Sequence, residues 1–463
     1  MSNFQPPPTV LLPHLPAKTL VGIDLLSFTS TEQFHGITDL PAGWHFLYTG
    51  TTSNFSLRCG AWFYVGDITH VEHTHAQSQN DAHDQQPIVR AQGWEVRIWK
   101  WNGETETLLP MLSNTDENRL EIMRSKANLG RLRQMGALFG YRSEQAQEGD
   151  IRQSDWGKLT DRLSPQILSR IVGGEAHIDD DGRPSWSITS ASSAARDAEH
   201  IPGLGAQEAS NVTGRFGSEK EEKELQFLPV DLKRTWREGA IGRERTEAAQ
   251  DRSWALGDLI QRYNNTGPSS SDQRQGENHI LGELQFCFLM VLTLMNYSCL
   301  EQWKRLLGLI LTCRMAIRER EGFFKDVLEL LLLQLQHCRD VEGGLFEMDG
   351  DYDGNFLRKL LTGFRPLMNE ALDGVADSVV KNQMDALEQW VRAEYGWELR
   401  KESIMRRGMM QLEDGEQVEL VMTGADEDDE TGEYAPVIVD TGEGDGTAAS
   451  DADHDIEIST PVN

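Results

Sequence analysis

A run of apolar residues at positions 284–295, LQFCFLMVLTLM, constrains the fold more than any other segment of this chain. The run is too short to span a bilayer, and it begins directly after Glu283. Residues 281–296 are apolar on nearly every face of a helix, which is typical of a central helix packed on all sides. We therefore expect a buried core helix here and no membrane segment.

The sequence around this run predicts an all-α domain over residues 224–400. Helices are predicted at residues 253–263, 281–296, 298–318, 323–338, 356–362 and 377–395. In the last of these, Val380, Met384, Leu387 and Val391 recur at intervals of three and four and indicate one buried stripe, and Gly396 suits the end of the helix. Antiparallel helices joined by short loops favour a bundle or a solenoid-like array.

Residues 18–172 predict a β-rich, sandwich-like domain closed by helices. Large aromatic residues alternate with others at positions 44–48, as in a half-buried strand, and the preceding Pro-Ala-Gly suits a tight turn. Residues 59–65 and 94–101 predict two more strands. Helical spacing starts near Leu120, and a second short helix is expected over residues 154–171. The overall expectation is an α+β chain of two domains.

Three further segments are predicted to contribute no core. Residues 1–17 are proline-rich and are interpreted as a flexible N-terminus, and residues 173–223 have few large apolar side chains and read as a disordered linker. Residues 401–463 form an acidic tail, in which positions 413–463 carry 17 Asp and Glu and no Lys or Arg. The net charge of the chain is −30, so we expect no broad nucleic-acid-binding face.

The cysteines do not predict a disulfide framework. There are five of them, none in a CxxC spacing, and four lie in apolar, helix-like sequence where a free thiol acts as a small hydrophobic group. The N-terminus has no basic region followed by a long apolar core, so no secretory signal is expected. An intracellular, reducing compartment follows from both observations.

Two clusters suggest metal binding, but neither has the pattern of a known site. His70, His73, His75 and His83 lie close in sequence, yet their spacing matches no zinc site and no cysteine accompanies them. Residues 349–354, DGDYDG, start like a calcium loop, but its twelfth position is Leu360 where a bidentate Glu is required. No nucleophile elbow, phosphate-binding loop or HExxH helix is present. We therefore expect no metal, no other cofactor and no catalytic residue set.

Short strand-like segments interrupt the acidic tail. Residues 417–422, QVELVM, and 434–440, YAPVIVD, are rich in β-branched residues. A flexible arm with such a strand is suited to adding itself to the open sheet edge of a partner, with alternate side chains entering pockets. Folding back onto the protein's own domains is an equal alternative on physical grounds alone.

Two long blocks make the chain resemble a known family. Residues 22–48, GIDLLSFTSTEQFHGITDLPAGWHFLY, and residues 281–311, LGELQFCFLMVLTLMNYSCLEQWKRLLGLIL, resemble the two signature regions of the Aar-two family of splicing factors, which assemble the U5 snRNP. Weaker similarity covers residues 225–241 and 434–440. The resemblance implies a β-rich N-terminal domain, an all-α C-terminal domain, no enzymatic activity, and a location in cytoplasm and nucleus.

The resemblance also implies a partner. In the family, the factor binds the RNase H-like and Jab/MPN-like domains of the large scaffold protein of the U5 particle, and it keeps the particle's RNA helicase off that scaffold until release. Release is thought to depend on phosphorylation. The strand expected to bridge the two domains corresponds here to Ala435, Pro436, Val437, Ile438 and Val439. Because Pro436 has no N–H, its nitrogen should face away from the paired edge.

Two alternative functions belong to other classes. One is a hydrolase with dispersed catalytic residues in the β-rich domain and His45 as the base; a hydrogen-bonded core histidine is the structural explanation of the same residue. The other is an RNA-binding snRNP subunit that uses a local basic face formed by Lys304, Arg305, Arg314, Arg318 and Arg320. Exposed serines, including Ser190, Ser192, Ser193 and residues 269–271, are general candidates for phosphorylation.

Overall fold

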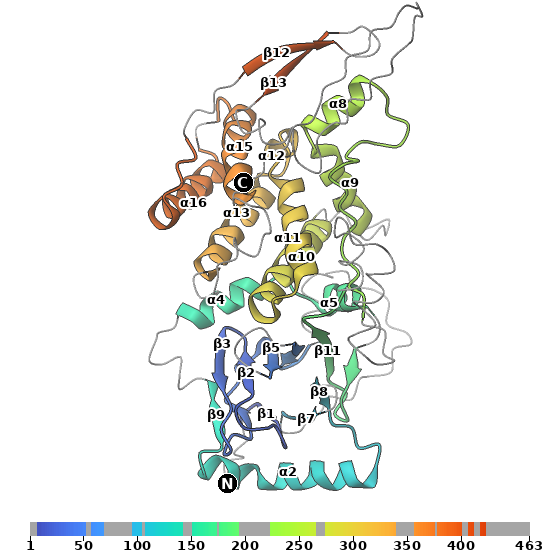
Figure 1. Cartoon of the computed structure of the whole chain (residues 1–463), viewed down its shortest axis with the longest axis vertical. Helices are drawn as coiled ribbons and strands as arrows, with labels where there is room; N and C mark the ends of the chain where they lie inside the picture. The colour runs from blue at the N-terminus through green and yellow to red at the C-terminus, as the bar shows by residue number, and fades with distance from the viewer. Residues whose placement is uncertain are drawn as a thin grey trace, which may run out of the picture. The chain divides into compact units, whose positions relative to one another are not determined.

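A computed structural model describes most of the chain (Figure 1). The described residues are 7–51, 57–68, 95–103, 107–141, 151–173, 176–193, 223–264, 274–338, 356–375 and 377–400, together with the backbone of 406–411 and 417–422. The chain divides into two compact units, residues 1–401 and residues 402–463. The predicted α+β fold class, with a β-rich N-terminal part and a helical C-terminal part, is confirmed.

Two sheets make up the N-terminal part of the first unit. One has the strand order β8-β7-β1-β4-β9 and the other the order β10-β11-β6-β5-β2-β3. Strand β1 pairs in parallel with β7 and antiparallel with β4. The strands are β1 (Thr9–Leu11), β2 (Leu20–Ile23), β3 (Leu26–Thr29), β4 (Gly36–Thr38), β5 (Gly43–Gly50), β6 (Arg58–Val65), β7 (Val96–Asn102), β8 (Thr107–Pro110), β9 (Leu138–Gly140), β10 (His177–Ile178) and β11 (Pro184–Thr189).

A shared apolar core lies between these sheets. Val10, Ile37 and Trp99 of the five-stranded sheet belong to the same buried cluster as Leu47 and Phe63 of the six-stranded sheet. Side chains from two inner faces that interdigitate in this way define a β-sandwich. The sandwich-like architecture expected from the sequence is thus observed.

Strand β5 differs from its prediction as a half-buried strand. Trp44 and Phe46 face the helices on one side of the sheet, while His45 and Leu47 face the inside of the sandwich. All four are almost completely buried. Alternation therefore identified the strand correctly, but the helices cover the face that would otherwise contact solvent.

The helices of the first unit are α2 (Asp116–Gln134), α4 (Ile151–Thr160), α5 (Pro165–Val172), α8 (Arg243–Gln250), α9 (Ser253–Tyr263), α10 (Arg274–Leu294), α11 (Tyr297–Ile310), α12 (Met315–Glu319), α13 (Glu321–Gln336), α15 (Phe356–Ala371) and α16 (Val379–Tyr395). The single helix predicted over residues 154–171 is two helices. Ser164 accepts a hydrogen bond from the backbone N–H of Ile167, and Pro165 occupies the first position of α5.

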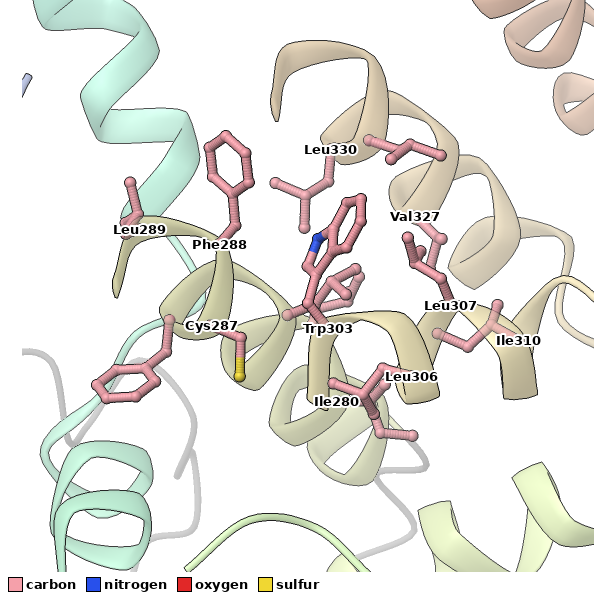
Figure 2. Close-up of a cluster of buried hydrophobic side chains, with 14 of the residues drawn as sticks. Ile280, Cys287, Phe288, Leu289, Trp303, Leu306, Leu307, Ile310, Val327 and Leu330 are labelled. Carbon is pink, nitrogen blue, oxygen red and sulfur yellow. The ribbon is translucent and has the colours of Figure 1, made fainter. Parts of the chain in front are cut away.

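Helix α10 is the centre of the helical part, as its sequence predicts (Figure 2). Phe286, Cys287 and Phe288 are at most 1% exposed. Trp303 of α11 and Val327 of α13 belong to the same cluster. Among the residues that the structure describes, no helix has the length and apolarity needed to cross a membrane. The apolar run is therefore explained by packing on all sides within the protein.

The apolar core of the helical part continues into the β-sandwich. Trp62 and Trp186 of the six-stranded sheet share a buried cluster with Leu168 of α5 and Phe286 of α10. On the opposite side of the sandwich, α2 packs against the outer face of the five-stranded sheet. The two predicted domains are consequently parts of one compact unit.

Two segments predicted to lack structure contribute strands. The prediction of a flexible N-terminus is wrong for residues 9–11, because β1 lies between β4 and β7 in the five-stranded sheet. The prediction of a disordered linker is wrong for β10 and β11, since β11 pairs with β6 along five residues and Trp186 is 3% exposed. Strand β1 is short and follows three consecutive prolines, and β11 has only two large apolar residues, Trp186 and Ile188, so the composition of the surrounding segments concealed both strands. Residues 194–222 of the predicted linker lie outside the described part.

The C-terminal helices match the predicted pattern with one extension. Val380, Met384, Leu387 and Val391 of α16 are fully buried, and Gly396 adopts a left-handed φ of 68° at its C-cap. Helix α15 continues through Pro366 to Ala371, well past the predicted end at residue 362. The second unit contains an antiparallel hairpin of β12 (Arg406–Gln411) and β13 (Gln417–Met422).

Candidate partner-binding surfaces

The tail supplies one of its two predicted strands to a hairpin. Residues 417–422 are strand β13, as predicted, and they pair in register with β12 from Arg406↔Met422 to Gln411↔Gln417. Each strand of such a hairpin has a second edge that its partner does not pair, and unpaired edges can accept a further strand. The predicted bridging residues, Ala435, Pro436, Val437, Ile438 and Val439, lie outside the described part of the chain.

His45, the predicted base of the hydrolase alternative, is part of a buried hydrogen-bond network inside the sandwich. Its Nδ1 lies 2.7 Å from Asp24 Oδ2, and its Nε2 lies 2.9 Å from the carbonyl oxygen of Pro41. Asp24 also accepts hydrogen bonds from the Tyr141 hydroxyl at 2.6 Å and from the backbone N–H of Phe46 at 2.8 Å. Both ring nitrogens thus face acceptors, which favours the doubly protonated imidazolium.

The charge state of His45 follows from two opposing effects. Burial alone lowers the pKa of His45, but the Asp24 carboxylate and the Pro41 carbonyl outweigh it, so that the pKa is raised above the ordinary value of 6.5. A general base must be able to receive a proton, and a ring that donates from both nitrogens cannot. The arrangement therefore favours the structural explanation of His45 over the catalytic one.

We expect the contribution of His45 to stability to depend on pH. Because its folded-state pKa is raised, the folded protein binds more protons than the unfolded chain at pH values above 6.5. The stability advantage of the wild type over His45→Gln is full below that pH and decreases as the pH rises through the folded pKa, by about 1.4 kcal/mol per unit of pKa difference. Urea unfolding of the wild type and of His45→Gln, at a series of pH values from below 6.5 upward, measures this difference in the free energy of unfolding. An advantage that grows with pH would contradict the assignment.

The predicted basic face of the helical part is largely neutralised. Lys304 pairs with Glu301 at 3.3 Å, Arg314 with Glu370 at 2.9 Å, and Arg320 with Glu277 at 2.7 Å. Arg305 and Arg318 have no carboxylate partner among the described residues. Cations that are paired with carboxylates are poorly available to a phosphate backbone, so the structure does not support the RNA-binding alternative at this face.

The predicted metal clusters cannot be placed. His70, His73, His75 and His83, and the segment 349–354, lie outside the described residues. Within the described ranges, no group of three or more His, Cys, Asp or Glu side chains could hold a metal ion. All five cysteines are buried free thiols, as their apolar sequence context predicts.

Two of the candidate phosphorylation sites are buried. Ser192 and Ser193 are at most 4% exposed, and the hydroxyl of Ser193 accepts a hydrogen bond from the backbone N–H of Leu225 at 2.8 Å. The hydroxyl of Ser190 accepts one from the backbone N–H of Arg58. The assumption that these serines are exposed is therefore wrong for Ser192 and Ser193, and residues 269–271 lie outside the described part.

The carboxylate of Glu283, which directly precedes the apolar run, is buried and joins the two parts of the first unit. Glu283 of α10 lies 2.7 Å from the guanidinium of Arg170 of α5 and accepts a hydrogen bond from Gln302 of α11 at 2.8 Å. It also accepts a hydrogen bond from the backbone N–H of Leu228 at 2.9 Å. Burial raises the pKa of Glu283, and the Arg170 charge opposes that effect. In the sequence, the position of Glu283 directly before the apolar run at residues 284–295 was the pattern that could have indicated a buried carboxylate here.

Further polar contacts cross the same junction. Gln285 of α10 donates to Asp161 Oδ1 at 2.6 Å and accepts from the backbone N–H of Arg162 at 3.0 Å. Arg58 of β6 donates to the carbonyl oxygen of Thr293 at 2.8 Å. These directional contacts fix how the sandwich and the helices are oriented, so any surface that spans both parts of the unit is preformed.

Comparison with known proteins decides the family. A sequence model of the AAR2 N-terminal domain matches residues 6–173, and a model of the AAR2 C-terminal repeat region matches residues 227–400. The chain belongs to the AAR2 family. This is the Aar-two family that the two signature blocks resemble. The matched regions hold strands β1 to β9 with helices α2, α4 and α5, and the helical part from α8 to α16.

Curated AAR2 relatives match along nearly their whole length. The Protein AAR2 homolog of Homo sapiens and that of Pongo abelii are each 24% identical over 412 residues, which is 85% of this chain and 90% of the relative. The Mus musculus homolog is 22% identical over 408 residues. Membership of the AAR2 family supports a splicing-related role for this chain.

Proposed function

We propose that this AAR2 protein is a non-catalytic assembly factor of the U5 snRNP in pre-mRNA splicing. It binds the RNase H-like and Jab/MPN-like domains of the large scaffold protein and keeps the RNA helicase off that scaffold until release. The observation that carries the proposal is the pair of AAR2 matches, which cover both parts of the chain in the order expected for the family.

The proposed mechanism is competition between mutually exclusive partners. A protein that occupies a surface lowers the apparent affinity of any competitor for that surface according to its own concentration and dissociation constant. No covalent step, cofactor, metal or direct nucleic-acid contact is needed for this role. The buried, hydrogen-bonded junction around Glu283 supports it, because a surface that is already ordered loses little conformational freedom on binding. We propose the cytoplasm and the nucleus as its location, because the proposed role is in the assembly of this particle.

A binding experiment tests the proposal directly. The full-length chain is immobilised and exposed to scaffold fragments that contain the RNase H-like domain, the Jab/MPN-like domain or both. We expect the fragment with both domains to bind most tightly, and the helicase to lose access to it as the AAR2 protein is added. Absence of binding to either domain, or simultaneous binding of the helicase, would refute the proposed function.

The predicted strand at residues 434–440 should contribute to the affinity for the scaffold. Deleting residues 434–463 removes Ala435 to Val439 and with them a strand that is suited to pairing with an open sheet edge of the scaffold. We expect the dissociation constant for the two-domain fragment to rise about tenfold or more, which corresponds to about 1.4 kcal/mol. Isothermal titration calorimetry measures the change.

A shorter truncation is the matched control for the tail. Deleting residues 442–463 removes acidic sequence but keeps the strand at positions 434–440. We expect this variant to bind nearly as well as the full chain. Equal affinities of the full chain and of the longer deletion would rule out strand addition by this segment.

A further inference from the structure

The hairpin of β12 and β13 has open strand edges. Its two strands pair with each other from Arg406↔Met422 to Gln411↔Gln417, and among the described residues they form a sheet of these two strands alone (Figure 1). A two-stranded hairpin is at best marginally stable in water, and independent stability needs a third strand or a packed helix. An added strand would therefore stabilise this hairpin, and the outer edge of β13 offers unpaired N–H and C=O groups to it.

The chain itself carries a strand-like segment within reach of this edge. Residues 434–440, YAPVIVD, follow β13 after a linker at residues 423–433, which has Gly424 and Gly432 near its ends. A flexible linker of this length spans about 17–20 Å on average. An antiparallel neighbour of β13 would begin only about 5 Å from the end of that strand, which is the spacing of paired strands. The linker therefore allows residues 434–440 to return along β13 without strain.

The edge of β13 fits this segment better in length than the sheet edges of the first unit do. The outer strands of the two larger sheets are β3 and β8 with four residues each, β9 with three and β10 with two. Strands β12 and β13 have six residues each. Strands that follow one another in the chain also pair more often than remote ones. Length and sequence order thus both favour β13 as the partner of residues 434–440.

Pro436 is compatible with this position. A strand added to β13 would itself be an outer strand, with one paired edge and one open edge. Proline has no N–H and is tolerated where that group would face the open edge. Because every second residue of an antiparallel strand directs its N–H and C=O to the same side, Ala435, Val437 and Val439 would then face β13. Pro436 would also hinder the addition of a further strand to the open edge.

We propose that residues 434–440 pair antiparallel with the outer edge of β13 in the free protein and complete a three-stranded sheet. A tethered segment has an effective concentration on the order of millimolar, so even a weak pairing is populated. The consequence for regulation rests on the proposed function, which assigns the same segment to the scaffold protein. The edge that faces β13 cannot pair with the scaffold at the same time. The hairpin is therefore an internal competitor that lowers the apparent affinity for the scaffold until the segment leaves β13.

Hydrogen exchange of the free chain, followed by mass spectrometry, tests the pairing without the scaffold. We expect the amides of β13 to exchange about tenfold faster when residues 434–463 are deleted, and at the wild-type rate when residues 442–463 are deleted. In the full-length chain, Val437→Pro removes an N–H that faces β13 and should act like the longer deletion. Ile438→Pro is its matched control at the open edge and should leave β13 protected. Unchanged exchange in the longer deletion, or equal effects of the two proline variants, would overturn the inference.

The competition is measured separately with the two-domain scaffold fragment. Replacing residues 406–422 by a Gly/Ser linker of equal length removes both hairpin strands but keeps the tail segment and its reach. If about nine-tenths of the wild type is in the paired form, this variant should bind the fragment about tenfold more tightly. An unchanged or weaker affinity would overturn the competition. Absence of binding by the wild type would refute the proposed function, and the exchange rates of the free chain would still decide whether residues 434–440 pair with β13.

Discussion

Replacing Glu283 by Ala should destabilise the first unit by about 3–5 kcal/mol. The carboxylate is completely buried, and its removal leaves the guanidinium of Arg170 without its charge partner and the backbone N–H of Leu228 without its acceptor. Both groups are held at the junction of α5, α10 and the segment before α8. Chemical unfolding followed by tryptophan fluorescence measures the loss, because Trp303 lies on the neighbouring helix α11.

A surface pair provides the control for this change. Glu329 of α13 lies 2.7 Å from Lys325 but is 57% exposed, so Glu329→Ala should cost no more than about 0.5 kcal/mol. Glu283→Gln, which keeps an acceptor for Leu228, should fall between the two. A loss below about 1 kcal/mol for Glu283→Ala would show that the junction is held by apolar packing alone.

Replacing Asp24 by Ala should cost a similar amount, about 3–5 kcal/mol. Asp24 accepts from His45, Tyr141 and the backbone N–H of Phe46, and all of these donors lie inside the sandwich. Without the carboxylate, a buried imidazolium would have to lose its proton or remain unpaired. The loss should therefore appear as lower stability and as a lowered pKa of His45, which NMR titration of the ring can follow.

Asp39 offers a control that shares the backbone conformation of Asp24. Asp24 has a φ of 57° and Asp39 one of 63°, a left-handed region that Asp tolerates better than Ala. Among the described residues, the ion-pair partner of Asp39 is Arg133, 3.2 Å away at the surface. Asp39→Ala should thus report the backbone strain of about 1–2 kcal/mol, and the excess loss in Asp24→Ala should report the buried network. Equal losses would show that the network contributes nothing.

Much of the fold could be predicted from local patterns. The stripe of Val380, Met384, Leu387 and Val391 predicted a buried helix face, and the uniformly apolar run predicted the central helix α10. Both signals arise from the period of a helix, which is a property of neighbouring residues. The strands β1 and β11 were missed because their pairing partners are remote in sequence, and only those partners make the short segments stable.

For the candidate site residues too, local sequence identified the residues, and remote contacts decided their roles. His45 could be identified as a residue with two possible roles, but its role depends on Asp24, Pro41 and Tyr141, which the sandwich brings together. The helical spacing that begins at Leu120 and Met123 predicted α2 correctly. It could not show that these two residues face outward, since Ile122, Leu129 and Leu132 supply an equally periodic inner face.

By itself, the sequence determined the α+β class, the central apolar helix, the free thiols and the resemblance to the Aar-two family, because each depends on residue type and local spacing. The tertiary structure alone decided that the sandwich and the helices share one core, that Glu283 and Asp24 are buried acceptors, and that α2 leaves Leu120 and Met123 exposed. Those properties depend on which side chains meet across long separations in the chain, and a one-dimensional pattern does not contain the distances between them.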